Sequence, residues 1–315
     1  IDLHCDTLIK LHEQGCGLED VQGHIDLDAL RRGGALVQCF AVYTPTHEQV
    51  HKHKITTGPW EYFNTAADIF DREMEKHREL IRPVRCAAEI QENLGAGRIS
   101  ALLTLEDGVC IDGRMERLQQ LYDRGVRMIA LTWNYENSIG FPNSADPELH
   151  ALGLKPFGFE VVERMGELGM IVDVSHLSEG GFYDVAEAVK GPFAASHSCA
   201  RALCKHSRNL TDRQLRVLGD HGGVCGVNFY SSFLTGTDFT AIDDILRHME
   251  YIADKAGIEA VALGSDFDGI DCELEFGGYA GMPRLIEAIA ARFGSGSADR
   301  ICYENALRVM RDVIG

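Results

Sequence analysis

His4 and Asp6 are the first residues of the chain that could act together on a metal ion. They lie in residues 1–6, which we interpret as a β-strand. Because alternate side chains of a strand point to one face, His4 and Asp6 would share a face and Cys5 would point to the other. Imidazole nitrogen and carboxylate oxygen both bind zinc or a similar divalent ion. Two ligands do not make a site, so the rest of the chain must supply the others.

Further residues of this chemistry end later apolar segments, and they are Glu106, His176, His197 and Asp266. A single histidine after an apolar run is more often a hydrogen-bonded structural residue than a ligand. All of these residues end predicted strands, and this shared position favours metal ligands over isolated structural residues. One zinc ion needs only three or four protein ligands, so the surplus favours a site with two metal ions.

The elements that must position these residues alternate along the chain. Apolar runs predict eight strands, and helical stretches separate them. The strands are expected at residues 1–6, 35–43, 100–106, 127–132, 170–176, 193–197, 223–230 and 260–266. This pattern predicts an α/β fold, namely a (β/α)₈ TIM-type barrel of the metal-dependent hydrolase type. In such barrels the catalytic side chains lie at the C-terminal ends of the strands.

We expect residues 1–315 to form a single barrel domain with C-terminal helices. A doubly wound open sheet is the alternative, but no Gly-x-Gly-x-x-Gly turn follows the first strand. Helices are expected at residues 60–81, 115–124, 157–168, 179–189, 211–218 with Thr211 as N-cap, 241–256, 283–293 and 298–314.

Two predicted loops stand out. Residues 133–155 form a long loop, and long loops within compact domains are usually functional. Residues 45–59 form a polar loop, so we interpret His51 and His53 as solvated despite their metal-pair spacing. Glu73, Glu75 and Glu79 are interpreted as an exposed helix face.

Composition narrows the classes of partner. The 315 residues are 45% hydrophobic and 25% charged, as in an ordinary soluble globular protein. A formal charge of −18 argues against nucleic acid or an anionic membrane as partner, and no apolar run approaches membrane-spanning length. Ten cysteines without a Cys-x-x-Cys pair indicate reduced thiols and a cytoplasmic protein. The chain begins at Ile1 and not at Met, so the removal of a leader segment is left as an open alternative.

Six motifs together carry a family resemblance. They are Asp2-Leu3-His4-Cys5-Asp6, Leu105-Glu106-Asp107-Gly108, Asp173-Val174-Ser175-His176, Ser196-His197-Ser198, Arg208-Asn209-Leu210 and Gly264-Ser265-Asp266-Phe267-Asp268-Gly269. Each motif alone is weak, but the ordered set covers nearly the whole chain and resembles the membrane (renal) dipeptidase family of zinc dipeptidases.

The resemblance implies a fold, a ligand set and a substrate. Its fold is a (β/α)₈ barrel, and its substrates are dipeptides, including those with a C-terminal D-residue. It implies two divalent metal ions, expected to be Zn²⁺, and a possible homodimer. The positions implied as ligands are His4 and Asp6 for one ion, His176 and His197 for the other, and Glu106 as the bridge. Arg208 matches the residue that receives the substrate carboxylate.

The residue types then suggest a mechanism. A hydroxide between two metal ions would attack the peptide bond, and Asp266 would pass its proton to the leaving nitrogen. The planar fork of Arg208 suits a free C-terminal carboxylate. Tyr230, at the end of the seventh expected strand, could line the substrate pocket or belong to the core.

One residue departs from the family pattern. The family often has a histidine after the Leu-Thr of the fourth strand, whereas this chain has Trp133. An indole cannot accept a proton, although its N–H could donate one hydrogen bond to substrate. We expect activity with an altered preference.

Two other functions stay open at this stage. One is a different amide hydrolase or deacylase on the same barrel, although no lysine ends a predicted strand to serve as a carbamylated bridge. The other is a catalytically silent metal-binding barrel, which would need neither Asp266 nor Arg208.

Overall fold

Eight parallel strands close into a barrel in the computed structural model, which describes residues 1–46 and 48–315. They pair in the order β1, β2, β4, β5, β6, β7, β8 and β10, and β10 pairs again with β1. Their bounds are β1 (Asp2–Cys5), β2 (Val37–Tyr43), β4 (Ile99–Glu106), β5 (Met128–Ala130), β6 (Ile171–Asp173), β7 (Ala194–Ser198), β8 (Val224–Val227) and β10 (Val261–Leu263). The predicted (β/α)₈ barrel is confirmed.

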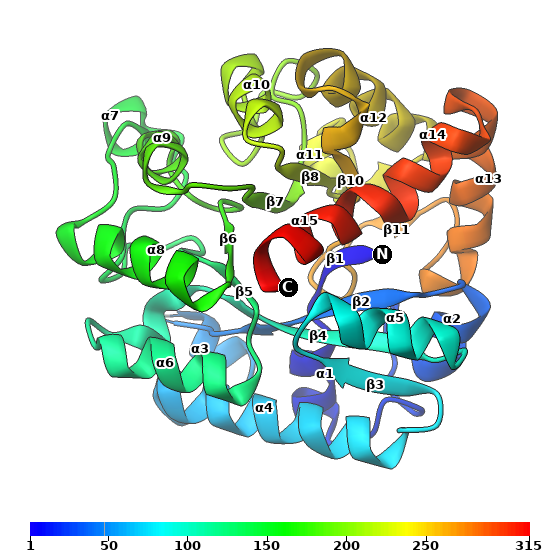
Figure 1. The fold of residues 1–315 in the computed structure, drawn as a ribbon, viewed down its shortest axis with the longest axis horizontal. Helices are drawn as coiled ribbons and strands as arrows, with labels where there is room; N and C mark the ends of the chain where they lie inside the picture. Colours follow the sequence, from blue (N-terminus) through cyan, green and yellow to red (C-terminus); the bar gives the residue numbers. More distant parts are fainter. Residues whose placement is uncertain (47) are drawn as a thin grey trace.

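Helices surround the strands on the outside of the barrel (Figure 1). They are α1 (Thr7–Gln14), α2 (Leu27–Arg32), α3 (Glu48–Lys52), α4 (Pro59–Lys76), α5 (Ala87–Gly95), α6 (Met115–Arg124), α7 (Pro147–His150), α8 (Pro156–Leu168), α9 (Glu179–Ala188), α10 (Asp212–Asp220), α11 (Ser231–Leu234), α12 (Ile242–Ala256), α13 (Met282–Phe293), α14 (Ser295–Asp299) and α15 (Asn305–Ile314). Thr211 caps α10 as predicted, in a reciprocal capping box with Gln214. In the described part of the chain, no helix has the length and apolar character needed to cross a membrane.

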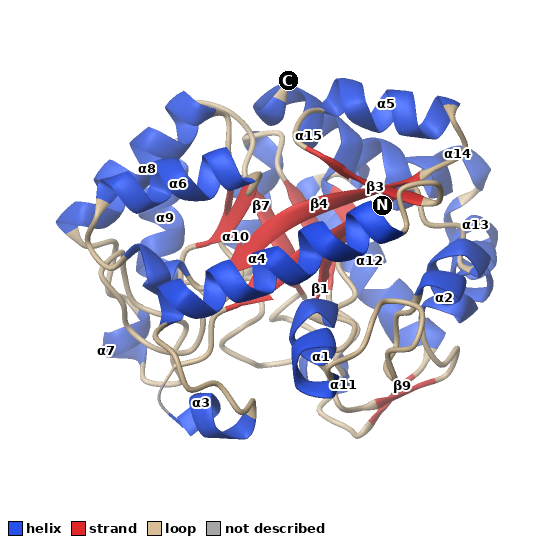
Figure 2. Ribbon diagram, turned by 90° about the horizontal axis from the view of Figure 1, so that it is seen from below, coloured by secondary structure: helices blue, strands red, loops and turns tan. Residues whose placement is uncertain are grey.

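The two ends of the barrel are covered differently (Figure 2). Helix α15 lies across the end where the strands begin, and its residues Leu307 and Met310 join a buried cluster with Val37, Ile171 and Val224 from those strands. Loops, together with α3, α11 and the short strand β9 (Phe239–Thr240), gather at the opposite end. The apolar plug formed with α15 thus lies at the N-terminal ends of the strands, and polar side chains can gather at their C-terminal ends.

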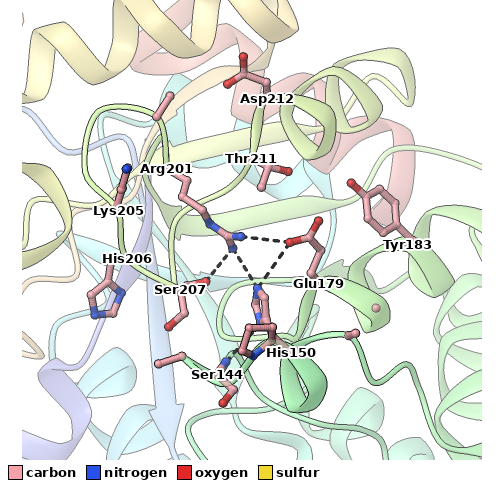
Figure 3. Close-up of a pocket in the computed structure, with 15 residues that line it drawn as sticks. Ser144, His150, Glu179, Tyr183, Arg201, Lys205, His206, Ser207, Thr211 and Asp212 are labelled. Carbon is pink, nitrogen blue, oxygen red and sulfur yellow. Dashed lines mark hydrogen bonds and ion pairs between the residues drawn. The ribbon is translucent and has the colours of Figure 1, made fainter.

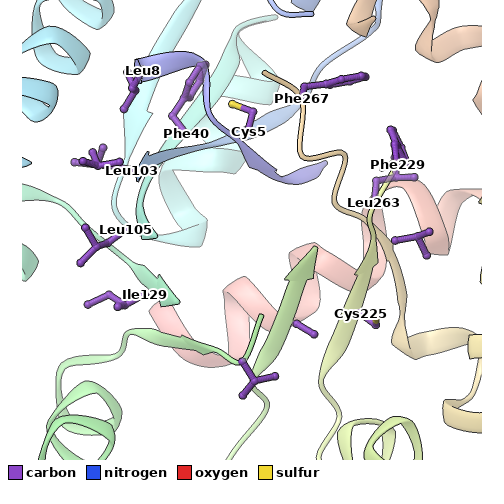
Figure 4. Packing of buried hydrophobic residues seen from close by; sticks show 14 of the residues in the cluster. Cys5, Leu8, Phe40, Leu103, Leu105, Ile129, Cys225, Phe229, Leu263 and Phe267 are labelled. Atoms are coloured by element: carbon purple, nitrogen blue, oxygen red, sulfur yellow. The ribbon is translucent and has the colours of Figure 1, made fainter. Parts of the chain in front are cut away.

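The outward side chains of the strands pack against the helices. Every residue of β2 and β4 is buried, which accounts for their near-continuous apolar runs. Phe40 on β2 meets Phe70 on α4 edge to face, with ring centres 6.1 Å apart. Figure 4 shows Cys5, Phe40 and Leu103 from neighbouring strands in this outer cluster. The expectation that Cys5 points away from His4 thus agrees with its packing.

The structure also corrects several boundaries. The helix expected at residues 60–81 ends at Lys76, and Ile81 begins a further strand, β3 (Ile81–Val84), which pairs with the first half of β4. Pro83 is compatible with β3 because an edge position does not need its missing N–H. A second small sheet joins β9 to β11 (Glu273–Leu274). The short strands β3, β9 and β11 contain no extended apolar run, so the sequence pattern did not predict them.

Local contacts overturn two interpretations of polar segments. The expected loop at residues 45–59 contains helix α3, while His47 within it lies outside the described residues. Glu73 does not belong to an exposed helix face, because it is 2% exposed and accepts a hydrogen bond from Leu18 N at 2.9 Å. Glu75 and Glu79 are exposed as expected.

Truncating the helix that closes the barrel should lower stability. Met310 on α15 is fully buried, so Met310→Ala removes apolar contacts and leaves a cavity. We expect a loss of about 2–5 kcal/mol in the free energy of unfolding. Urea denaturation followed by circular dichroism would measure it, with Arg311→Ala on the exposed side of the same helix as control. Equal midpoints for the two variants would contradict the role given to α15.

Candidate metal centre

Six side chains able to bind metal or carry protons meet at the C-terminal end of the barrel. His4 lies in β1, Glu106 is the last residue of β4, and His197 lies in β7. The other three follow strands: Asp6 after β1, His176 after β6 and Asp266 after β10. The six residues predicted to form the site are therefore brought together, from five different strands.

Glu106 is the centre of the group. Its Oε1 lies 2.9 Å from His176 Nε2 and 3.4 Å from His197 Nε2. Its Oε2 lies 3.7 Å from His4 Nε2. The Nε2 atoms of His176 and His197 are only 3.0 Å apart, and Glu106 is 3% exposed. Three imidazoles thus share one carboxylate that is shielded from water.

Hydrogen bonds set the orientation of two imidazoles. His197 Nδ1 lies 2.7 Å from Ser196 Oγ, which in turn contacts a carboxylate oxygen of Asp173. Ser196 Oγ–H donates to that oxygen, so the hydroxyl oxygen is left to accept from His197 Nδ1–H. His176 Nδ1 donates to Asn134 Oδ1 at 3.0 Å. Burial lowers the pKa of both histidines well below the ordinary value, so each neutral ring directs an Nε2 lone pair into the site.

The other side of the group is formed by His4, Asp6 and Asp266. His4 Nε2 lies 3.5 Å from Asp6 Oδ2 and 3.9 Å from Asp266 Oδ1. Within the described residues, the buried atoms His4 Nε2 and Asp6 Oδ1 have no hydrogen-bond partner. Buried polar atoms without partners are costly, so these atoms are placed for a ligand of their own. Nitrogen and carboxylate donors of this kind fit a divalent ion such as zinc.

Electrostatics point to the same conclusion. Burial, reinforced by the negative charge of Asp6, raises the pKa of Glu106 well above its usual value. Burial likewise raises the pKa of Asp266 to about 7. For His4, burial opposes the charged form, but Glu106, Asp6 and Asp266 outweigh it and raise the pKa of His4 to about 10. The group as a whole therefore attracts a cation.

Two of the six residues have a left-handed backbone. His176 has φ 69° and Asp266 has φ 61°. Asp107, next to Glu106, has φ 75°, and Asp268, two residues after Asp266, has φ 69°. A residue with a Cβ rarely adopts this conformation, which costs about 1–3 kcal/mol and concentrates at functional sites. The fold thus accepts local strain to aim these side chains.

Strand irregularities accompany the two neighbouring imidazoles of His4 and His197. The rings of His4 and His197 lie 3.9 Å apart between centres. The pairing of β1 with β2 shifts register between Asp2 and Cys5, and the pairing of β7 with β8 shifts between Ala195 and Ser198. Such bulges re-aim side chains and often lie beside active sites.

A cavity of about 590 Å³ opens over the group. Asp6, Glu106 and Asp266 form part of its wall, together with Trp133 and Tyr230. Both aromatic residues predicted at the pocket therefore line it. The volume is within the range of small-ligand sites, and the wall mixes aromatic with charged groups.

Arg208 approaches the group from the loop after β7. Its side chain is buried, and its Nη2 donates to His197 O at 3.2 Å. Its Nε is buried without a hydrogen-bond partner in the described part of the chain. The guanidinium lies 5.4 Å from the ring centre of Phe233, which lines the same cavity. A cation with an unused donor therefore lies next to the cavity.

A larger cavity of about 910 Å³ lies nearby (Figure 3). Arg201 Nη1 donates to Glu179 Oε2 at 3.1 Å, and Arg201 Nη2 lies 3.0 Å from His150 Nε2. Arg201, Glu179 and His150 satisfy one another, and none of the described residues that form this wall belongs to the six clustered at the barrel mouth. Size alone therefore does not identify the site.

Another cluster with metal-binding side chains lies on the outside of the barrel. It consists of Glu19, Glu73 and His77. Lys76 already pairs with Glu19, and Leu18 N donates to Glu73. Because protein donors occupy these carboxylates, we interpret the cluster as an ion-pair network that holds α4 to the loop after α1.

Sequence reasoning missed several residues around the cavity. His53 was expected in solvent, but it pairs with Glu13 and lines the cavity wall. Tyr43, the last residue of β2, also lines it, and the strand-end rule that found Glu106 could have found Tyr43. The hydrogen bond of Asn134 with His176 carried no comparable signal, because it depends on the fold of the loop around Asn134.

The sequence and the fold both match known proteins. The family model described as membrane dipeptidase (Peptidase family M19) matches residues 1–314. An uncharacterised protein in the pqqA 5′ region of Klebsiella pneumoniae is 38% identical over 72% of this chain and 87% of its own length. An uncharacterised dipeptidase of Schizosaccharomyces pombe is 35% identical over 78% of this chain, and the match covers 61% of that longer protein.

Two solved structures cover almost all of the chain. The dipeptidase AC, a metallopeptidase of family M19, has a TM-score of 0.88 at 26% identity, covering 99% of this chain and 97% of that one. A metallopeptidase from Rhodobacter sphaeroides, solved with a phosphinate mimic of the dipeptide L-Ala-D-Ala, has a TM-score of 0.89 at 26% identity, covering 99% and 98%. Hydrolase chemistry of the metallopeptidase type is thus supported at the level of the family. The resemblance seen in the sequence is confirmed, and the chain belongs to the membrane dipeptidase family, Peptidase family M19.

Proposed function

We propose that this protein hydrolyses the peptide bond of dipeptides that have a free C-terminal carboxylate, using two divalent ions, with zinc as the native metal. The observation that carries the proposal is the convergence of His176 and His197 on Glu106 with both Nδ1 atoms engaged elsewhere. Two nitrogen lone pairs and a carboxylate this close repel one another unless a proton or a metal ion lies among them, and this set of donors suits a divalent metal ion.

We assign His4 and Asp6 to one ion, His176 and His197 to the other, and Glu106 to both. Two sets of side chains at the barrel mouth have ligand atoms that all lie within 4.8 Å of one another: His4, Glu106 and His197, and His4, Asp6 and Asp266. His4 belongs to both sets, so proximity alone does not divide the ligands. The division proposed here follows the strands, since β1 supplies one pair and β6 and β7 supply the other.

Bound ions would supply Lewis acidity, which lowers the pKa of bound water to about 7 and polarises a carbonyl group. Asp266 is the proposed proton carrier. Its Oδ2 accepts a hydrogen bond from Asn228 Nδ2 at 2.8 Å, which leaves Oδ1 facing His4 and the cavity. A carboxylate in this position can take a proton from the attacking water and return it to the leaving nitrogen.

Arg208 is proposed to hold the substrate carboxylate. Among the described residues its buried Nε has no hydrogen-bond partner, and a carboxylate can pair with a guanidinium through two parallel hydrogen bonds. Tyr230 and Trp133 would flank the substrate from the cavity wall. We also propose tolerance of a C-terminal D-residue, supported by the L-Ala-D-Ala mimic held by the Rhodobacter sphaeroides neighbour.

Purified protein should hydrolyse L-Ala-L-Ala and L-Ala-D-Ala and contain about two divalent ions per chain. Amine release and elemental analysis would measure these properties. N-acetyl-alanine and N-acetyl-L-Ala-L-Ala are the control substrates, because a deacylase would cleave the former. Cleavage of the acetyl compound without dipeptide hydrolysis would contradict the proposal.

Glu106→Gln should remove the shared ligand. An amide presents only one acceptor oxygen, so we expect metal content to fall toward one ion per chain or below and kcat to fall by at least about 100-fold. The matched control is Glu13→Gln, which changes another carboxylate of the same cavity wall. Metal content equal to that of wild type would argue against a bridging role.

Arg208→Met should weaken recognition of the carboxylate. Loss of one partner of a buried charge pair costs about 2–5 kcal/mol, so kcat/KM for L-Ala-L-Ala should fall about 30-fold or more. The same substitution should affect L-alanyl-L-alaninamide much less, because that compound has no terminal carboxylate. Equal losses on both substrates would indicate that Arg208 acts only on the fold.

A further inference from the structure

Tyr43 occupies a position equivalent to that of Glu106 on the neighbouring strand. The two residues are register partners in the pairing of β2 with β4, and each is the last residue of its strand. Parallel partners in register project to the same face of a sheet. Tyr43 accordingly lines the 590 Å³ cavity alongside Glu106.

The hydroxyl of Tyr43 is buried and unused. The residue is 7% exposed, and across residues 1–46 and 48–315 its Oη has no hydrogen-bond partner. A buried tyrosine hydroxyl usually finds a partner, so an unused one in a cavity wall is available to a ligand. Burial, with the negative charges of Glu106 and Asp6 nearby, raises the pKa of Tyr43 above its ordinary value. The group therefore keeps its proton and acts as a donor.

Neighbouring rings hold the phenol in place. Trp133 packs against it at an interplanar angle of 61°, with ring centres 4.9 Å apart. His53 packs edge to face at 5.8 Å. A side chain fixed on two sides loses little further freedom when a ligand binds, which suits a preorganised donor.

The charges of the cavity indicate which substrate atom this donor serves. Asp6, Glu13 and Asp271 in the wall can accept hydrogen bonds from an ammonium group, whereas a phenol that keeps its proton donates to an oxygen, as Lys10 and Lys52 of the same wall also can. Arg208 lies after β7, on the opposite side of the barrel ring from β2. A carboxylate held at Arg208 leaves the scissile carbonyl, near Glu106, as the substrate oxygen closest to Tyr43.

We infer that Tyr43 is a catalytic residue that donates a hydrogen bond to the carbonyl oxygen of the scissile peptide as that oxygen becomes negatively charged. The inference rests on the proposed dipeptidase function and assigns one further residue to it. Tyr43 forms no covalent bond and keeps its proton, so the hydrogen bond strengthens during attack and weakens when the amine leaves. The proton balance stays with Asp266.

The test compares Tyr43→Phe with Tyr62→Phe. Tyr62 on α4 is also buried but does not line the cavity. For Tyr43→Phe we expect kcat on L-Ala-L-Ala to fall about 100-fold, as for loss of one oxyanion donor, with KM within about twofold. The inhibition constant of the phosphinate analogue of L-Ala-D-Ala, a tetrahedral mimic, should weaken by a similar factor. Metal content and thermal midpoint should match those of Tyr62→Phe.

Other outcomes separate the possible failures. Unchanged kcat and unchanged phosphinate binding in Tyr43→Phe would overturn the inference while leaving the dipeptidase function intact. A rise in KM alone, with loss of discrimination against N-acetyl-L-Ala-L-Ala, would place Tyr43 at the substrate amine and also overturn it. A wild-type protein inactive on all dipeptides would instead overturn the proposed function itself.

Discussion

A single buried carboxylate, Glu106, is the constraint on which the arrangement at the barrel mouth depends. Three imidazoles lie around it. Two of them, His176 and His197, direct the lone pair of Nε2 toward it, because their Nδ1–H groups donate to Asn134 and Ser196. Like-signed electron density held this close is unfavourable in a medium of low dielectric constant. The fold can hold these groups together because each one is fixed at the end of its own strand. A positive charge among them would remove the repulsion.

The barrel supplies the rigidity that this arrangement needs. Each strand ends at the same rim, so residues distant in sequence meet without a long loop to hold them. The left-handed backbone at His176 and Asp266 and the register shifts around His4 and His197 then adjust the final direction of each side chain. Such local strain persists only where the surrounding packing is strong, and the fully buried strands β2 and β4 provide that packing.

Residue type and strand position were sufficient to predict the barrel and to bring Glu106, His176 and His197 to one rim, because the periodicity of apolar residues marks strand ends directly. The same reasoning failed at His53 and Glu73. Their burial depends on contacts with Glu13 and Leu18 from the N-terminal part of the chain, and no local pattern records such contacts. The short strand β3 was not predicted for a related reason, because it is a strand only through its pairing with β4.

The pairing of β1 with β10 has a consequence for biosynthesis. Asp2 pairs with Leu263, so the first strand must wait for most of the chain to leave the ribosome before its second neighbour exists. His4 and Asp266 flank that seam from either side. Contacts this distant in sequence form late and slowly. The rim that carries all six clustered side chains can therefore be complete only after translation has passed residue 266.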